Sequence, residues 1–132
     1  MSLSDEERST IVALEMEKAK RTFAEAEKLK EGEFWNGVAS RLYYAVFHAV
    51  NALLINDRHQ VNTHNGAHAM FALHYIKNGI LDAEYGRLYN QLQTMRQESD
   101  YNCIYNVESE ELLERMEPAR RLIEIIEKMI EQ

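Results

Sequence analysis

Residues 38 to 54 read VASRLYYAVFHAVNALL, and this stretch decides the fold class. Its apolar side chains recur every three or four positions and form two neighbouring stripes, as they do on an α-helix. A helix that is apolar over most of its circumference belongs in the middle of a bundle. We therefore expect a helix from about residue 33 to residue 55 at the centre of an all-α protein.

The composition points to the same fold class. The 132 residues include 45% hydrophobic residues but only five Gly and one Pro. This is enough apolar material for a core and too few turn-forming residues for a many-stranded β protein. The length fits one domain, and no linker, internal repeat or low-complexity stretch divides the chain. We expect residues 1–132 to form a single domain.

Cap residues and periodic apolar positions predict the other helices. Ser4 is a good N-cap, Thr63 or Asn65 can start a helix, and Gly79 can end one. Pro118 should kink the last helix or mark a restart. The expected ranges are residues 4–31, 65–77, 83–100 and 108–131, with a loop at 101–107. With the central helix they predict an antiparallel up-and-down bundle of four long helices plus one short helix.

The charge pattern restricts the partners of the protein. The formal net charge is −7, and Lys and Arg are interleaved with Glu along residues 15–21 instead of forming a basic stripe. A protein that coats DNA neutralises the phosphates with clustered positive charge. We expect no general DNA binding, whereas a small local RNA site is compatible with this charge.

The sequence also indicates where the protein resides. The first seven residues lack the basic and apolar regions of a signal peptide. No apolar run approaches the roughly 20 residues that span a membrane. Cys103 is the only cysteine, so no intrachain disulfide can form. We expect a cytoplasmic protein that does not enter a membrane.

The apolar central helix carries one polar stripe. Its members lie within less than a quarter of the helix circumference and are Ser40, Tyr44, His48 and Asn51. One interpretation is a solvent-exposed or dimer face with partly buried, hydrogen-bonded side chains. The other is that these residues line a groove that binds a ligand or RNA.

Arg96 violates the pattern of its own helix. With Tyr85, Tyr89 and Leu92 it recurs at spacings of four and three residues, so it lies within the apolar face. A guanidinium there stays charged and must be paired or lie at an edge. Arg96 is therefore either half of a structural ion pair, for example with Asp100, or a fixed cation for a phosphate or carboxylate.

The sequence favours neither a metal nor a cofactor. His64 and His68 are four residues apart and His74 is nearby, but no acidic or cysteine ligand completes the set. Cys103 has no neighbouring His or Lys that would activate it as a nucleophile. The chain contains no glycine-rich phosphate loop. We expect no metal site and no bound cofactor.

Several blocks of the sequence resemble one known family. They are residues 40–54, the run Thr63-His64-Asn65-Gly66, Phe71, Gly79-Ile80, and the run Arg96-Gln97-Glu98-Ser99-Asp100-Tyr101. In this order, from about residue 10 to residue 130, they are similar to the small prokaryotic HEPN proteins. The resemblance implies an up-and-down helical bundle that forms homodimers.

The same resemblance implies a toxin–antitoxin function. Many HEPN proteins are ribonuclease toxins, often encoded beside a minimal nucleotidyltransferase. Their motif is an arginine followed four to six positions after it by a histidine, and it cleaves RNA without a metal. Arg96 matches the arginine, but the histidine position holds Tyr101, Asn102 or Cys103. A tyrosine is a poor general base at neutral pH because its pKa is near 10.

Two main hypotheses follow, with a third that needs no ligand. The first is a homodimeric binding module, non-catalytic or weakly catalytic, in which Arg96, Asp100 and Tyr101 shape a site for a nucleotide, RNA or partner segment. For this module the resemblance to the HEPN family also implies a nucleotidyltransferase partner that would modify Tyr101 or Tyr105. The alternative is a metal-independent ribonuclease that uses Arg96, with Tyr101 or His48 in place of the missing histidine. The third is a purely structural subunit.

Overall fold

The computed structural model describes residues 2–60, 63–103 and 107–132. Across these residues the chain forms α-helices and one short π-helical segment, η1, and no strand. The elements are α1 (Asp5–Glu31), α2 (Trp35–Asn56), α3 (His64–Phe71), η1 (Ala72–Ile76), α4 (Ala83–Tyr101) and α5 (Ser109–Glu131). The prediction of an all-α bundle is confirmed.

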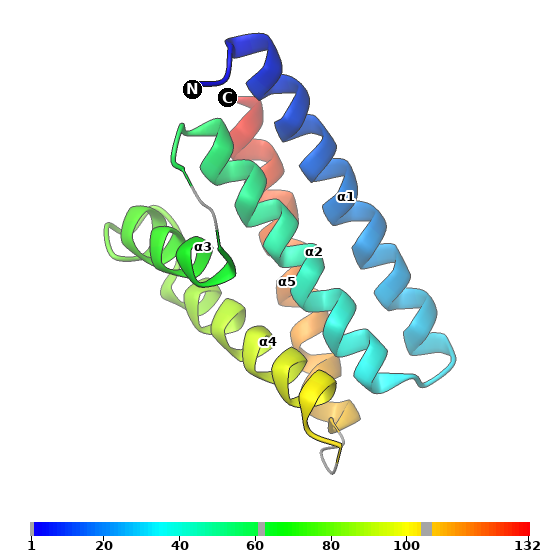
Figure 1. Ribbon diagram of the computed structural model, residues 1–132. Coiled ribbons are helices and arrows are strands. Elements are labelled where there is room, and N and C mark those ends of the chain that lie inside the picture. The colour runs from blue at the N-terminus through cyan, green and yellow to red at the C-terminus, as the bar shows by residue number, and fades with distance from the viewer. Residues whose placement is uncertain (1, 61–62, 104–106) are drawn as a thin grey trace.

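The four long helices α1, α2, α4 and α5 run alternately in opposite directions, and the short α3 lies beside α4 (Figure 1). α2 lies between α1 and α4, with α5 behind it. It packs against each of the other four α-helices. The most apolar stretch of the sequence is thus the central element of the bundle.

The buried residues form one apolar cluster around α2. Half of the residues of this helix are buried: Val38, Ala39, Leu42, Tyr43, Ala45, Val46, Ala49, Val50, Ala52, Leu53 and Leu54. The other helices each turn one apolar face toward it, as amphipathic helices do. On α4 this face includes Tyr89, Leu92 and Arg96. The arginine therefore lies at the rim of the core.

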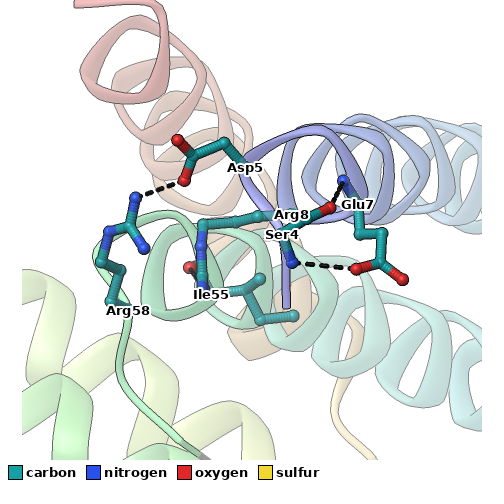
Figure 2. Close-up of polar contacts among 6 residues, drawn as sticks. All are labelled: Ser4, Asp5, Glu7, Arg8, Ile55 and Arg58. Carbon is teal, nitrogen blue, oxygen red and sulfur yellow. Dashed lines mark hydrogen bonds and ion pairs between the residues drawn. The ribbon is translucent and has the colours of Figure 1, made fainter. Parts of the chain in front are cut away.

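Specific polar contacts fix where the helices begin and end. The Ser4 hydroxyl accepts a hydrogen bond from the Glu7 backbone N–H at 3.1 Å, and the Glu7 carboxylate accepts one from the Ser4 N–H at 2.9 Å. Figure 2 shows this capping box beside the Asp5–Arg58 ion pair and the bond from Arg8 to the Ile55 carbonyl. These contacts stabilise α1 and join its start to the end of α2.

The residues that directly follow α2 contact η1. The Tyr75 hydroxyl donates to the Asp57 carboxylate at 2.5 Å, and His59 stacks on His74 at 3.9 Å. Gly79 adopts a positive φ of 78°, as predicted for a residue that ends a helix. Thr63 is the cap of α3, since its hydroxyl accepts from the Gly66 N–H at 2.9 Å.

Some sequence expectations need correction. The helix predicted at residues 65–77 is α-helical only to Phe71 and continues as η1. α4 extends to Tyr101, which was expected in a loop. Pro118 lies inside one helix, so the predicted restart is wrong.

α2 also corrects the expectation that no segment is long and apolar enough to cross a membrane. Among the described residues this one helix passes that test by length and composition. However, 61% of its most apolar stretch is buried inside the bundle. Such burial is typical of the core helix of a bundle.

Candidate functional site

Arg96 on α4 is held by aromatic rings from α2. Its side chain is almost buried, and the guanidinium carbon lies 4.9 Å from the centre of the Tyr43 ring and 5.7 Å from that of Tyr44. Such cation–π contacts stabilise a charge that has left bulk water. The Asp100 carboxylate, one turn further along α4, lies 3.5 Å from a guanidinium nitrogen. Arg96 is therefore paired at the edge of the core.

The pairing of Arg96 is incomplete. A guanidinium carries five N–H donors, and its ion pair with Asp100 is long for a charge-assisted hydrogen bond. The Arg96 Nε is buried and has no hydrogen-bond partner among the described residues. Burial alone would lower the pKa of Arg96, but the neighbouring Tyr44, Tyr43 and Asp100 raise it, so the charge persists. Arg96 is therefore a fixed cation with at least one N–H donor that no described residue accepts.

An imidazole from another helix lies in the same cluster. His64, the first residue of α3, has its Nδ1 2.9 Å from the Tyr43 hydroxyl. Its ring stacks on Phe47 at 4.2 Å, nearly parallel, and meets the edge of Tyr44 at 5.9 Å. Burial lowers the pKa of His64, and the nearby Arg96 and His48 side chains lower it further. His64 is therefore neutral at pH 7.

His68 is more deeply buried than His64 and packs against α4. It stacks on Tyr89 at 3.5 Å, and its Nδ1 is 3.2 Å from the Asn90 side-chain oxygen. Burial lowers the pKa of His68 to about 4. In the part of the chain that the structure describes, no three His, Cys, Asp or Glu residues are grouped to hold a metal. The two histidines are placed by aromatic packing.

The polar stripe of α2 divides between two neighbours. All four of its members, Ser40, Tyr44, His48 and Asn51, are half-buried. Tyr44 belongs to the Arg96 cluster. In contrast, His48 Nδ1 and the Asn51 amide lie 3.0 Å and 3.2 Å from one Glu15 carboxylate oxygen on α1. Ser40 accepts a long hydrogen bond of 3.5 Å from Arg41. The stripe is thus not a single site.

Comparison with known proteins agrees with this architecture. The family model of the HEPN domain matches residues 12–130. The chain belongs to the HEPN family. The match covers nearly the same range as the blocks that carry the resemblance in the sequence.

This HEPN chain is similar in sequence to three proteins from two prokaryotes. A "Putative toxin" of Methanocaldococcus jannaschii is 34% identical over 96 residues, which are 73% of this chain and 65% of that protein. A second "Putative toxin" of the same organism is 31% identical over 108 residues, 82% of this chain and 80% of that protein. A "UPF0332 protein" of Thermotoga maritima is 29% identical over 125 residues, 95% of each chain. The chain thus spans just under two thirds of the first relative.

The residues after Arg96 are where this HEPN chain departs from the family motif. Tyr101 is the last residue of α4 and is 79% exposed. It is close enough to Arg96 to contribute to the raised pKa of the guanidinium. Tyr105, the other tyrosine considered as a modification site, lies outside the described residues. The structure therefore brings Arg96, Tyr44, Asp100 and Tyr101 together.

The roles of two residues of the Arg96 cluster, His64 and Tyr43, and of Glu15 outside it were missed in the sequence. His64 was considered only as a metal ligand, and Glu15 was not considered as the partner of the polar stripe. Tyr43 was assigned to an apolar stripe, although its hydroxyl and ring touch both His64 and Arg96. The signal for His64 in the sequence is its place at the start of a helix that Thr63 caps.

A Glu15→Gln variant is expected to be less stable than the wild type at pH 7 by about 1 kcal/mol, the scale of a hydrogen bond. Burial raises the pKa of Glu15, but bonds from His48 and Asn51 lower it below 4.5 overall. A lowered pKa adds stability above 4.5 that is lost as the pH falls through the folded-state pKa. Urea unfolding at decreasing pH should therefore show the two proteins converging, whereas a constant difference would contradict this role.

Proposed function

We propose that this HEPN chain is a toxin–antitoxin-type protein that binds the phosphate groups of RNA or a nucleotide at Arg96. It acts as a non-catalytic or weakly catalytic module and as a homodimer in the cytoplasm. The observation that carries this proposal is the incompletely paired Arg96 guanidinium, fixed over Tyr43 and Tyr44 at the rim of the core. The names of the two toxin relatives support the toxin–antitoxin type.

The surroundings of Arg96 suit a single-stranded ligand. Phosphate oxygens match the fork of a guanidinium and would replace the distant Asp100 carboxylate. Tyr44, Phe47 and His64 are half-buried aromatic rings beside the cation. Unpaired bases stack on such rings without regard to sequence. A local cation of this kind is compatible with a net charge of −7, because the ligand is held by one site and not by a basic surface.

The half-buried stripe on α2 supports the homodimer. Ser40, Tyr44 and His48 face the side of α2 that its neighbours leave partly open. Partly buried tyrosine and histidine side chains are frequent where a surface meets a second copy. In this arrangement the partner copy would cover the α2 stripe and border the Arg96 cluster.

The exposed Tyr101 favours a regulated form of the same module. It lies at the end of α4 with most of its ring in solvent, beside the cation that binds the ligand. A nucleotidyltransferase partner that attached a nucleotide to its hydroxyl would place a phosphate next to Arg96 and block the site. The accessible ring at this position is the observation that favours such a partner.

Replacing Arg96 with Ala tests the proposed binding. We expect fluorescence anisotropy with a labelled single-stranded RNA of mixed sequence to show binding by the wild type, weakening as salt increases. Arg96→Ala should lose about 10-fold or more in affinity, because hydrogen bonds to charged groups contribute about 1.5–3 kcal/mol. Arg87→Ala, which removes an exposed arginine of the same helix, should bind as the wild type does.

Circular dichroism of both variants checks that the bundle is intact. Equal RNA affinity of folded Arg96→Ala and the wild type would rule out Arg96 as the anion site. Equal losses in Arg96→Ala and Arg87→Ala would show that net charge, and not this site, determines binding. The alternative function, a metal-independent ribonuclease, additionally needs a proton acceptor beside Arg96.

A further inference from the structure

The Arg96 cluster contains an imidazole that the sequence motif does not provide. His64 comes from α3 and Arg96 from α4, and each of them contacts both the Tyr43 and the Tyr44 ring. We infer that His64 is the proton-transfer residue of this site and replaces the histidine that is missing after Arg96. The inference rests on the proposed binding of RNA at Arg96 and assigns a cleavage role to the same site.

Two contacts fix the orientation of the His64 ring. Phe47 lies flat against the imidazole at 4.2 Å, and the Tyr43 hydroxyl lies 2.9 Å from Nδ1. The Thr63 cap fixes the start of the helix on which His64 lies. The opposite ring nitrogen, Nε2, is not buried and has no hydrogen-bond partner within the described part of the chain. A side chain held in this way offers one defined nitrogen to a ligand, as proton transfer requires.

Tyr43 can support either protonation form of His64. Burial raises the pKa of Tyr43, so its hydroxyl stays protonated and can both donate and accept. When His64 Nδ1–H donates to the Tyr43 oxygen, Nε2 carries a lone pair and can accept a proton. Tyr43 thus acts as a positioning residue, because it keeps the ring in place while Nε2 changes its protonation.

The reaction that these groups can perform is transfer of a phosphodiester within RNA. His64 Nε2 takes the proton of a ribose 2′-hydroxyl, and the 2′-oxygen forms a bond to the adjacent phosphorus. The bond from phosphorus to the 5′-oxygen breaks, and that oxygen takes a proton from water while His64 releases its proton to water. The products are a 2′,3′-cyclic phosphate and a 5′-hydroxyl. Arg96 stabilises the negative charge on the phosphoryl oxygens.

The pH dependence of cleavage follows from the groups around His64. Arg96 on α4, His48, Tyr43 and Tyr44 on α2, and His68 on α3 face or adjoin the ring. Burial, Arg96 and His48 lower the pKa of His64 from 6.5. A general base acts in its unprotonated form, so the rate should rise with pH through the His64 pKa and level off near neutral pH.

A cleavage assay in EDTA with the labelled single-stranded RNA tests the inference. The wild type should cleave and leave 2′,3′-cyclic phosphate ends, and His64→Ala should cleave about 100-fold more slowly or worse when both proteins are present in enough excess to bind all of the RNA. His74→Ala is the matched control. His74 lies in η1, and its ring stacks on His59 and not on the residues of the Arg96 cluster. An RNA with 2′-O-methyl groups throughout should bind and stay intact.

The outcomes separate the inference from the proposed function. If the wild type cleaves no RNA, or if His64→Ala cleaves as fast as the wild type, the role of His64 is overturned. The proposed binding is judged separately by the anisotropy of Arg96→Ala. If His64→Ala fails to fold, His64→Gln takes its place, because glutamine keeps a partner for Tyr43 but cannot exchange a proton at neutral pH. Slow cleavage by His64→Gln supports the inference, and a wild-type rate overturns it.

Discussion

An Arg96→Met variant is expected to be at least as stable as the wild type and to bind RNA about 10-fold more weakly or worse. Methionine has a similar length, fills the same space beside Tyr43 and Tyr44, and carries no charge that must leave water. Replacing both partners of a buried ion pair by apolar side chains is often neutral or stabilising by about 1–4 kcal/mol, and removing one partner is costly only when the other stays buried. Asp100 is exposed, so its carboxylate is solvated when Arg96 is absent.

The two effects of Arg96→Met have opposite signs, and this makes the variant informative. Urea unfolding followed by circular dichroism measures the stability, and anisotropy with labelled RNA measures the binding. Arg115→Met is the matched control, because Arg115 is a partly buried arginine on α5 paired with Glu111 and Gln91. It should bind RNA normally. Normal RNA binding by Arg96→Met would instead favour the purely structural subunit.

Leu53→Ala is expected to cause the largest loss of stability, about 2–5 kcal/mol. Leu53 is 1% exposed and lies on α2, the helix that packs against each of the other four α-helices. Shortening its isobutyl side chain to a methyl group leaves a cavity that a central helix cannot close by moving, since a shift toward one neighbour opens a gap at another. Urea unfolding followed by Trp35 fluorescence and by circular dichroism should give the same lowered midpoint.

An exposed leucine provides the control for Leu53→Ala. Leu14 on α1 is 59% exposed, so Leu14→Ala should change the free energy of unfolding by less than about 0.5 kcal/mol. Equal losses in the two variants would contradict the central position of α2. Two different midpoints for fluorescence and circular dichroism in Leu53→Ala would contradict unfolding of the bundle as one unit.

The helices could be predicted from the sequence because their signals are local. The Ser4 cap with Glu7, the Thr63 cap and the positive φ of Gly79 all act within a few residues. The apolar period of residues 38–54 is a property of one helix. It predicted both the type of this element and its place at the centre.

The candidate site could be predicted only in part. Arg96 was recognisable because it interrupts an apolar face, and its partner Asp100 lies on the same helix. The position of His64 depends on how α3 crosses α2, which no period along the chain records. Glu15 is a similar case, since the pattern on α2 shows a polar stripe but does not show which helix faces His48 and Asn51.

The π-helical segment η1 makes the chain tolerant of a change in length at one place. The Lys77 N–H bonds to the Ala72 carbonyl, five residues earlier, so the turn holds one residue more than an α-helical turn. Leu73 lies in this turn and is 52% exposed. A chain one residue shorter here can close into a regular α-helix with Phe71 and Tyr75 still in the core. Homologues that differ in length by one residue between these two aromatic positions can therefore share the same site.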